Sequence, residues 1–160
     1  MRLIKENYLF FILIISLFIT DRLVKNEILD ILKDLDYLFI NDYLNLNLVF
    51  NTGIGFGILS LNAGVYYNIL TVIIFLVILV LLFIMMKLSA KEKIYFSLII
   101  GGAIGNLYDR IFFKAVPDFI DFHIKEFHWF TFNLADIFIS LGIILVLLNE
   151  LVYKKQKNEN

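Results

Sequence analysis

Long apolar runs separated by short clusters of charged residues dominate the hydrophobic pattern of this chain. Three of these runs each supply the roughly 20 apolar residues that cross a hydrocarbon core of about 30 Å. The first run, residues 8–20, is shorter, and it reaches that length when its apolar flanks are included and Lys5 and Arg22 extend their charged ends to the interface. The pattern predicts four transmembrane helices, at about residues 4–24, 65–86, 94–113 and 133–153.

The first run also shares a feature with cleaved signal peptides, because Arg2 and Lys5 precede an apolar stretch of suitable length. No A-x-A-like cleavage site follows it, and residues 20–25 continue as plausible helix. We therefore predict that this segment is retained as a membrane span.

Basic residues in the short flanks predict the orientation of the helices. One side of the membrane receives Arg2, Lys5, Lys87, Lys91, Lys93, Lys154, Lys155 and Lys157. The longer loops on the other side, residues 21–64 and 109–131, contain ten acidic and six basic residues. Because short cytoplasmic loops are enriched in Lys and Arg, we expect both termini in the cytoplasm and the two long loops outside it.

Composition agrees with an all-α membrane protein. The 160 residues are 61% hydrophobic, with a mean hydropathy of +0.85, and this length predicts a single polytopic domain over residues 1–160. Helices packed on helices are expected in the bilayer, because lipid cannot satisfy backbone polar groups. The net charge of −1 does not favour nucleic acid as a partner. The absence of cysteine excludes thiol catalysis and Cys-type zinc sites.

The first outer loop is predicted to contain ordered structure. Residues 26–35 form an amphipathic stretch suited to lying on the membrane surface. Residues 37–40 and 43–50 flank a turn, and in the second of these segments leucine alternates with asparagine, which predicts a small β-sheet. The Gly-rich segment at residues 51–57 either folds over a site or serves as a flexible connector to the next span.

Ionisable residues near the spans gather at their predicted outer ends. Such residues are candidates for function, because a charge at the bilayer centre costs about 2.5–3.5 kcal/mol or more. Asp21 and Lys25 lie an i, i+4 step apart, so they can pair on one helical face. This pair is either an ordinary interfacial ion pair or part of a site.

The third predicted span carries small and polar residues near its outer end. Gly101 and Gly105 form a small-xxx-small pair, which lets another helix approach closely. Asn106 and Arg110 share a helical face, with Asp109 alongside. These polar residues are either interfacial anchors or supports for a site.

Two aspartates form the strongest candidate site. Asp118 follows Pro117 in an apolar, extended segment after the third span, where ionisation is costly. Asp136 lies inside the fourth apolar run, on one face with Asn133, although an acid in a first helical turn is also favoured by the helix dipole. Because these spans are consecutive and antiparallel, both aspartates return to the same membrane face. Two such carboxylates can share one proton and activate water, as in aspartic proteases.

This chemistry requires neither a metal ion nor a cysteine. The chain contains two histidines, His123 and His128, which we interpret as solvated loop residues rather than ligands. We therefore predict no metal site and no other cofactor.

Five segments of the chain, taken in order, resemble one known family. They are Thr20-Asp21 with Lys25; Asn51-Thr52-Gly53 through Phe56; Gly101-Gly102-Ala103 through Asn106 to Arg110; Val116 through Asp118 to Ile120; and Phe132-Asn133-Leu134-Ala135-Asp136. On these segments the chain resembles the bacterial lipoprotein signal peptidase (signal peptidase II) family across nearly its whole length.

The resemblance implies an endopeptidase of the bacterial cytoplasmic membrane, with its active site at the extracytoplasmic face. It would cut prolipoprotein signal peptides just before the diacylglyceryl-modified cysteine. The implied catalytic pair is Asp118 and Asp136. The implied lining and supporting residues are Asp21, Lys25, Asn51, Gly102, Asn106, Arg110 and Asn133. The expected partners are lipid-modified prolipoproteins and membrane lipid, with no nucleic acid, and the expected state is a monomer.

The chain departs from the usual family pattern at two positions beside the aspartates. Pro117 replaces an aliphatic residue and lacks a backbone N–H, and Ile137 replaces a common serine. Neither change removes a catalytic group.

A different class of function is a small ion-conducting or transport protein that uses the outer carboxylates as a cation site. Its polar groups should line several depths of a path, whereas those of this chain concentrate at one predicted face. An intramembrane protease of the presenilin type also uses two aspartates, but its G-x-G-D segment is missing here.

Overall fold

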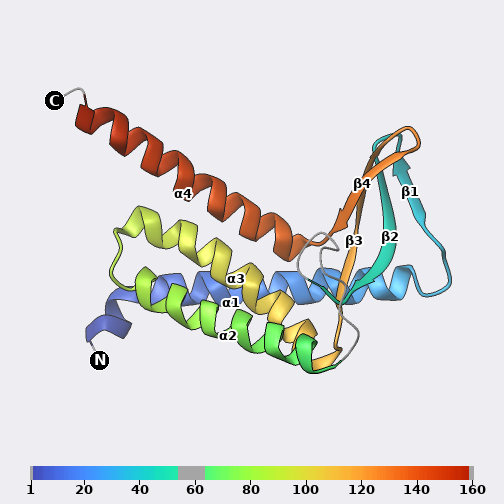
Figure 1. Ribbon diagram of the computed structural model, residues 1–160, viewed down its shortest axis with the longest axis horizontal. Coiled ribbons are helices and arrows are strands. Elements are labelled where there is room, and N and C mark those ends of the chain that lie inside the picture. The colour runs from blue at the N-terminus through green and yellow to red at the C-terminus, as the bar shows by residue number, and fades with distance from the viewer. Residues whose placement is uncertain (1, 54–63, 159–160) are drawn as a thin grey trace.

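The computed structural model describes residues 2–53 and 64–158, and within them it forms four long helices and one four-stranded sheet (Figure 1). The helices are α1 (Arg2–Ile31), α2 (Val65–Met85), α3 (Ala90–Phe112) and α4 (Leu134–Asn158). The strands are β1 (Leu38–Asn41), β2 (Leu44–Asn51), β3 (Val116–Ile124) and β4 (Phe127–Phe132). Most of the predicted Gly-rich segment at residues 51–57 lies outside the described residues.

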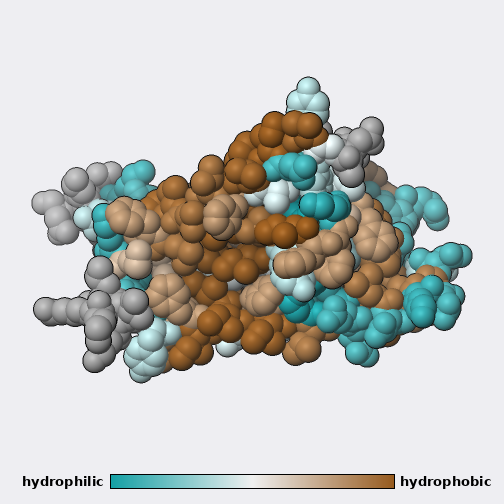
Figure 2. Space-filling view, turned by 90° about the horizontal axis from the view of Figure 1, so that it is seen from below, coloured by the Kyte–Doolittle hydropathy of each residue, from teal (hydrophilic) through white to brown (hydrophobic). Residues whose placement is uncertain are grey.

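The helices alternate in direction, so that both chain termini lie at one end of the bundle and the sheet lies at the other (Figure 1). Among the described residues, three helical segments are long and apolar enough to cross a membrane: Asn7–Ile31, Val65–Met85 and Leu134–Lys154. Hydrophobic side chains cover much of the helical surface in Figure 2, whereas hydrophilic ones gather toward the sheet. This distribution is that of a membrane protein, because lipid rather than water covers the exposed apolar side chains.

Helix α3 differs from these three helices because it is the inner one. It is 23 residues long and packs against α1, α2 and α4. A capping box starts it, in which Ser89 and Glu92 satisfy each other's backbone N–H groups. Its buried face carries glycines together with Asn106, Asp109 and Arg110, and these residues lower its hydropathy.

Three glycines of α3 let its neighbours approach closely, as the small-xxx-small pattern predicted. A Cβ on Gly101 would lie 2.8 Å from Cβ of Leu17, and one on Gly105 would lie 2.5 Å from Oδ2 of Asp21, so both face α1. A Cβ on Gly102 would meet the backbone carbonyl of Ala135 in α4. Glycine is therefore required where α3 contacts the outer part of α1 and the first turn of α4.

We expect Gly102→Ala to displace the start of α4, because a backbone carbonyl cannot rotate away from the new methyl group as a flexible side chain could. Overpacking of this kind costs about 1–3 kcal/mol, so Tm in detergent should fall. Gly142→Ala is the matched control, because its Cβ would lie 2.7 Å from the carbonyl oxygen of Tyr95 in the same α3–α4 contact. We expect similar losses of Tm in the two variants and, in Gly102→Ala, a larger loss of the activity that the family resemblance implies. Equal losses of that activity would contradict a displacement near Asp136.

The sheet joins the two segments predicted to be outer loops, which lie far apart in the sequence. The β1–β2 hairpin confirms the sheet predicted for the first outer loop. The β3–β4 hairpin comes from the second outer loop and pairs with β2, giving an antiparallel sheet in the order β1-β2-β3-β4. The prediction of a loop around His123 and His128 was therefore wrong. The apolar and aromatic residues around them favour strands once β2 is available to pair with them.

The amphipathic stretch predicted at residues 26–35 for the membrane surface packs in part against the sheet instead. Helix α1 continues without interruption to Ile31, and an apolar face at its C-terminal end packs against the sheet. Ile28 and Leu32 are buried in a cluster with Phe119 of β3. The sheet therefore covers Ile28 and Leu32, whereas Ile31 and Leu35 of the same segment remain exposed.

Candidate functional site

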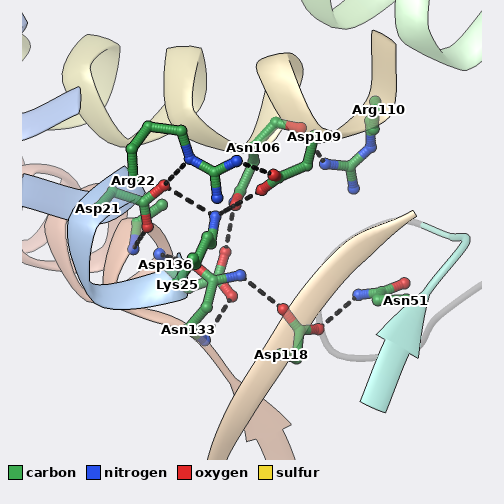
Figure 3. A network of polar contacts seen from close by, with 11 residues as sticks. Asp21, Arg22, Lys25, Asn51, Asn106, Asp109, Arg110, Asp118, Asn133 and Asp136 are labelled. Atoms are coloured by element: carbon green, nitrogen blue, oxygen red, sulfur yellow. Dashed lines mark hydrogen bonds and ion pairs between the residues drawn. The ribbon is translucent and has the colours of Figure 1, made fainter. Parts of the chain in front are cut away.

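Asp118 lies in β3, opposite Val49 of β2, and is only 2% exposed. Two amide side chains hold its carboxylate, as Figure 3 shows. Nδ2 of Asn51 donates a hydrogen bond to Oδ2 at 2.9 Å, and Nδ2 of Asn133 donates one to Oδ1 at 2.5 Å. Asn51 ends β2 and Asn133 precedes α4, so strand pairing and the start of a helix together fix the position of this carboxylate.

Asp136 lies in the first turn of α4, where local helix chemistry orients it. Its backbone N–H donates to Oδ1 of Asn133 at 3.1 Å, and the backbone N–H of Asn133 donates to Oδ2 of Asp136 at 3.2 Å. This is the reciprocal arrangement of a capping box, with Asn133 as the N-cap residue. Nδ2 of Asn106 donates to Oδ1 of Asp136 at 2.8 Å. Asn133 thus contacts both aspartates.

Both carboxyl groups line one cavity of about 340 Å³. Its polar lining consists of Asn51, Asn106, Arg110, Asp118, Asn133, Asp136 and Ser140. Apolar residues such as Leu70 of α2, Ala103 of α3 and Ile139 of α4 complete the wall. The structure therefore brings to one place the two aspartates and four of the seven residues that the resemblance implied as lining or supporting ones.

Burial in this site changes the acidity of Asp118. Loss of hydration is the main cause, and the negative charge of Asp136 adds to it, so that the pKa of Asp118 rises from its ordinary value of 3.8 to about 6. The amide donors Asn133 and Asn51 act in the opposite direction, because they stabilise the ionised form. The Asp118 carboxyl group can therefore gain or lose a proton near neutral pH.

A buried charge network lies beside the cavity and connects α1 with α3 (Figure 3). Lys25 is fully buried, and its Nζ lies 2.9 Å from Oδ2 of Asp21 and 2.7 Å from Oδ2 of Asp109. The same Nζ donates to Oδ1 of Asn106 at 2.9 Å. Lys25 thereby holds the side chain of Asn106, which contacts Asp136. Its positive charge also lies between two buried carboxylates and attracts both.

The network also reaches the start of α4. Oδ1 of Asp21 accepts a hydrogen bond from the backbone N–H of Ala135 at 3.1 Å. This contact satisfies one of the amide groups that a helix N-terminus leaves without an internal partner, and it places a carboxylate where the helix dipole favours negative charge. Asp21 therefore helps to position the helical turn that carries Asp136.

Arg110 anchors the chain at the end of β2. Its Nη2 donates to the carbonyl oxygen of Gly53 at 2.8 Å, and its Nη1 donates to the carbonyl oxygen of Asn106 at 3.2 Å. The backbone N–H of Gly53 in turn donates to Oδ1 of Asn51 at 2.8 Å. These contacts fix the side chain of Asn51 against Asp118.

Arg22 and Asp109 also belong to this charge network, which the sequence did not predict. Arg22 was interpreted as a residue reaching the interface, but its Nη1 lies 2.6 Å from Oδ1 of Asp109, and its guanidinium stacks on the ring of Tyr108. Asp109 is fully buried. Charge balance was the signal that could have found them. Lys25 neutralises only one of two nearby acidic residues, so a second cation such as Arg22 is needed.

The apolar helices and the buried polar cavity at one end of them define a class of integral membrane protein, and known structures narrow it to membrane enzymes. A bacterial membrane enzyme solved by the in meso method at 2.3 Å resolution superposes with a TM-score of 0.76 at 28% sequence identity, covering 94% of this chain and 91% of that chain. A second, solved by the same method at 1.9 Å, gives a TM-score of 0.73 at 26% identity, covering 89% and 92%.

Sequence comparisons identify the family. The family described as signal peptidase (SPase) II matches residues 13–152. The lipoprotein signal peptidase of Pelagibacter ubique is 44% identical over 157 residues, covering 96% of this chain and 94% of that protein. The enzyme of the same name from Francisella tularensis subsp. mediasiatica is 36% identical over 160 residues, covering 98% and 99%. The chain belongs to the signal peptidase II family, the proteases that remove signal peptides from lipoproteins.

Proposed function

We propose that this chain is an aspartic endopeptidase that cuts diacylglyceryl-modified prolipoproteins just before the lipidated cysteine, with Asp118 and Asp136 as its catalytic pair. The main support is that both carboxyl groups line one cavity and are both held by Asn133. The raised pKa of Asp118 lets one proton remain on the pair near neutral pH.

In the proposed reaction a water molecule lies between the two carboxyl groups. The ionised carboxylate takes a proton from this water as its oxygen attacks the scissile carbonyl carbon, and the protonated carboxyl group donates a proton to the departing amide nitrogen. The C–N bond then breaks, leaving a carboxyl terminus on the signal peptide and an amino group on the modified cysteine. The shared proton belongs to the pair rather than to Asp118 or Asp136 alone.

We also propose that α3 is the fourth membrane span and that residues 1–160 form one polytopic domain of the bacterial cytoplasmic membrane. The 23-residue length of α3 and its position among the other helices support this. Because the helices alternate in direction, both termini would lie on one side of the membrane, and the basic residues in the short flanks favour the cytoplasm for that side. The cavity would then be extracytoplasmic. We further propose that the protein acts as a monomer.

An apolar groove beside the cavity suits the lipid part of the substrate. It has a volume of about 320 Å³ and follows α4 from Asp136. Its other lining residues are Phe130, Phe132, Ile137, Ser140, Leu141 and Ile144. Acyl chains lying here would gain from burial against apolar side chains while the peptide reaches the carboxyl groups. Ile137, where the family commonly has serine, would add to this apolar lining.

The proposed activity can be tested with the purified protein in lipid vesicles. The substrates are a diacylglyceryl-modified precursor and the same precursor with an unmodified cysteine, and mass spectrometry identifies the cleaved bond. We expect cleavage before the modified cysteine and little cleavage of the unmodified precursor. Cleavage at another bond, or equal cleavage of both precursors, would contradict the proposal.

The pH dependence of kcat/KM should change when Asn51 is replaced by alanine. In the wild type we expect kcat/KM to fall as pH rises through about 6, because the pair then loses its shared proton. Asn51 donates to the ionised carboxylate, so its removal should raise the pKa of Asp118 and move this fall to higher pH. Asn47→Ala, on the same strand but lining a different pocket, is the control. A shift to lower pH, or none, would argue against this role.

A further inference from the structure

A second polar cluster lies on the sheet, apart from the cavity described above. Asp121 and His123 occupy alternate positions of β3 and so point to the same face, and His128 of β4 is the cross-strand partner of His123. One carboxylate oxygen and one ring nitrogen from each histidine all lie within 4.8 Å of one another. Nδ1 of His128 is 2.8 Å from Oδ2 of Asp121.

One buried polar atom in this cluster and another beside it have no hydrogen-bond partner among the described residues. His123 is only 8% exposed, and its Nδ1 is buried without a partner among the described residues, 4.0 Å from Oδ2 of Asp121. Oδ1 of Asn45, which lies opposite Asp121 on β2, is also buried without a partner there. Buried polar atoms are normally satisfied, so each such atom requires an explanation.

A cation provides that explanation. The cluster borders an open polar pocket of about 580 Å³, where Asp36 and Glu126 add negative charge and Lys125 adds one positive charge. Two imidazoles and one carboxylate form a donor set suited to zinc, with three protein ligands and room for a fourth. Magnesium and calcium prefer oxygen ligands alone. We propose that Asp121, His123 and His128 bind one Zn²⁺ ion.

This ion would connect β3 to β4 a short distance along β3 from Asp118. A register irregularity separates the pairs at Phe122 and His123, and such bulges commonly re-aim side chains. A metal bridge here would hold the two strands together where their regular ladder is interrupted. The zinc site rests on the cluster alone and does not depend on the proposed peptidase mechanism.

Binding can be measured on the full chain, purified in detergent with a histidine-free tag and stripped with EDTA. Titration with ZnCl₂ by calorimetry, together with elemental analysis, should show one Zn²⁺ per chain. Co²⁺ should give the optical spectrum of an imidazole-coordinated site. Because the chain has two histidines and no cysteine, that spectrum can come only from His123 and His128.

Variants separate this site from general cation binding. The side chain of His128 is 54% exposed, so His128→Ala should remain folded while weakening Zn²⁺ binding by about tenfold or more. Asp42→Asn, an exposed acid in the β1–β2 turn, and Asp118→Asn should bind Zn²⁺ like the wild type. Zn²⁺ should also raise the Tm of the wild type but not that of His128→Ala. Absence of stoichiometric binding, or equal affinity in His128→Ala, would overturn the zinc site.

Discussion

Replacing either Asp118 or Asp136 with asparagine is expected to lower the rate of precursor cleavage by about 10³-fold or more. General acid–base catalysis by a positioned group typically contributes about 10²–10⁴-fold to a rate. Each replacement removes either the group that would take a proton from water or the group that would donate one to the departing nitrogen. Asparagine has nearly the same shape as aspartate, but only one of its two polar atoms accepts a hydrogen bond. A neighbouring amide side chain, Asn51 beside position 118 or Asn106 beside position 136, must therefore turn its oxygen toward the new Nδ2. The measurement is single-turnover cleavage of a diacylglyceryl-modified precursor in vesicles.

The effect must be separated from loss of folding. Asp42→Asn makes the same chemical change at an exposed position of the β1–β2 turn, and its activity should equal that of the wild type. The Tm of each active-site variant in detergent should stay within a few degrees of the wild-type value. Turnover near the wild-type rate in either Asp118→Asn or Asp136→Asn would show that this carboxyl group is not catalytic.

Lys25→Met is expected to cause the largest loss of stability among single replacements in the charge network. Lys25 is fully buried, and its removal leaves the carboxylates of Asp21 and Asp109 without their shared cation. Breaking a buried ion pair from one side costs about 3–5 kcal/mol. Activity should fall as well, because Lys25 also holds Asn106, which contacts Asp136. Thermal unfolding in detergent micelles measures the first effect.

The chain offers a matched control on its surface. Lys154 forms an i, i+4 ion pair with Glu150 at 3.3 Å, and its side chain is 69% exposed. Exposed pairs contribute about 0–1 kcal/mol, so Lys154→Met should change Tm very little. Adding Asp109→Asn to Lys25→Met should restore part of the lost Tm, because Arg22 would then face one buried carboxylate rather than two. Equal Tm values for Lys25→Met and Lys154→Met would contradict the structural role of the network.

Helices α2 and α4 could be predicted from the sequence because their apolar runs are nearly uninterrupted. The β1–β2 hairpin could be predicted equally well, since an apolar segment precedes the turn and leucine alternates with asparagine after it. Helix α3 is harder to assign from composition alone, because its neighbours are protein rather than lipid on several sides and its buried face can therefore carry glycine, asparagine and charge.

The β3–β4 hairpin could not be predicted with the same reliability. Its stability depends on pairing with β2, which lies in a different outer segment, and local periodicity contains no information about such distant partners. The continuation of α1 toward the sheet has the same origin, because Ile28 and Leu32 find their apolar cover on β3. Both features depend on contacts between segments that are far apart in the sequence.

In the candidate site, too, local features could be predicted from the sequence, whereas contacts between distant segments could not. The antiparallel course of consecutive spans correctly predicted that Asp118 and Asp136 reach one place, and the sequence alone also indicated that Asn133 shares a face with Asp136. The hydrogen bond from Ala135 to Asp21 could not be foreseen, because it requires α1 and α4 to approach α3 closely at its glycines. Tertiary packing, rather than local pattern, determines that contact.

A double-mutant cycle tests most directly whether Asp118 and Asp136 act as one catalytic unit. Single-turnover rates of precursor cleavage are measured in vesicles for the wild type, Asp118→Asn, Asp136→Asn and the double variant. Groups that act as a unit give strongly non-additive losses, so the double variant should cleave within about tenfold of the slower single variant. Losses that multiply, giving about a 10⁶-fold reduction from two 10³-fold effects, would show that the two carboxyl groups act independently and would contradict the account.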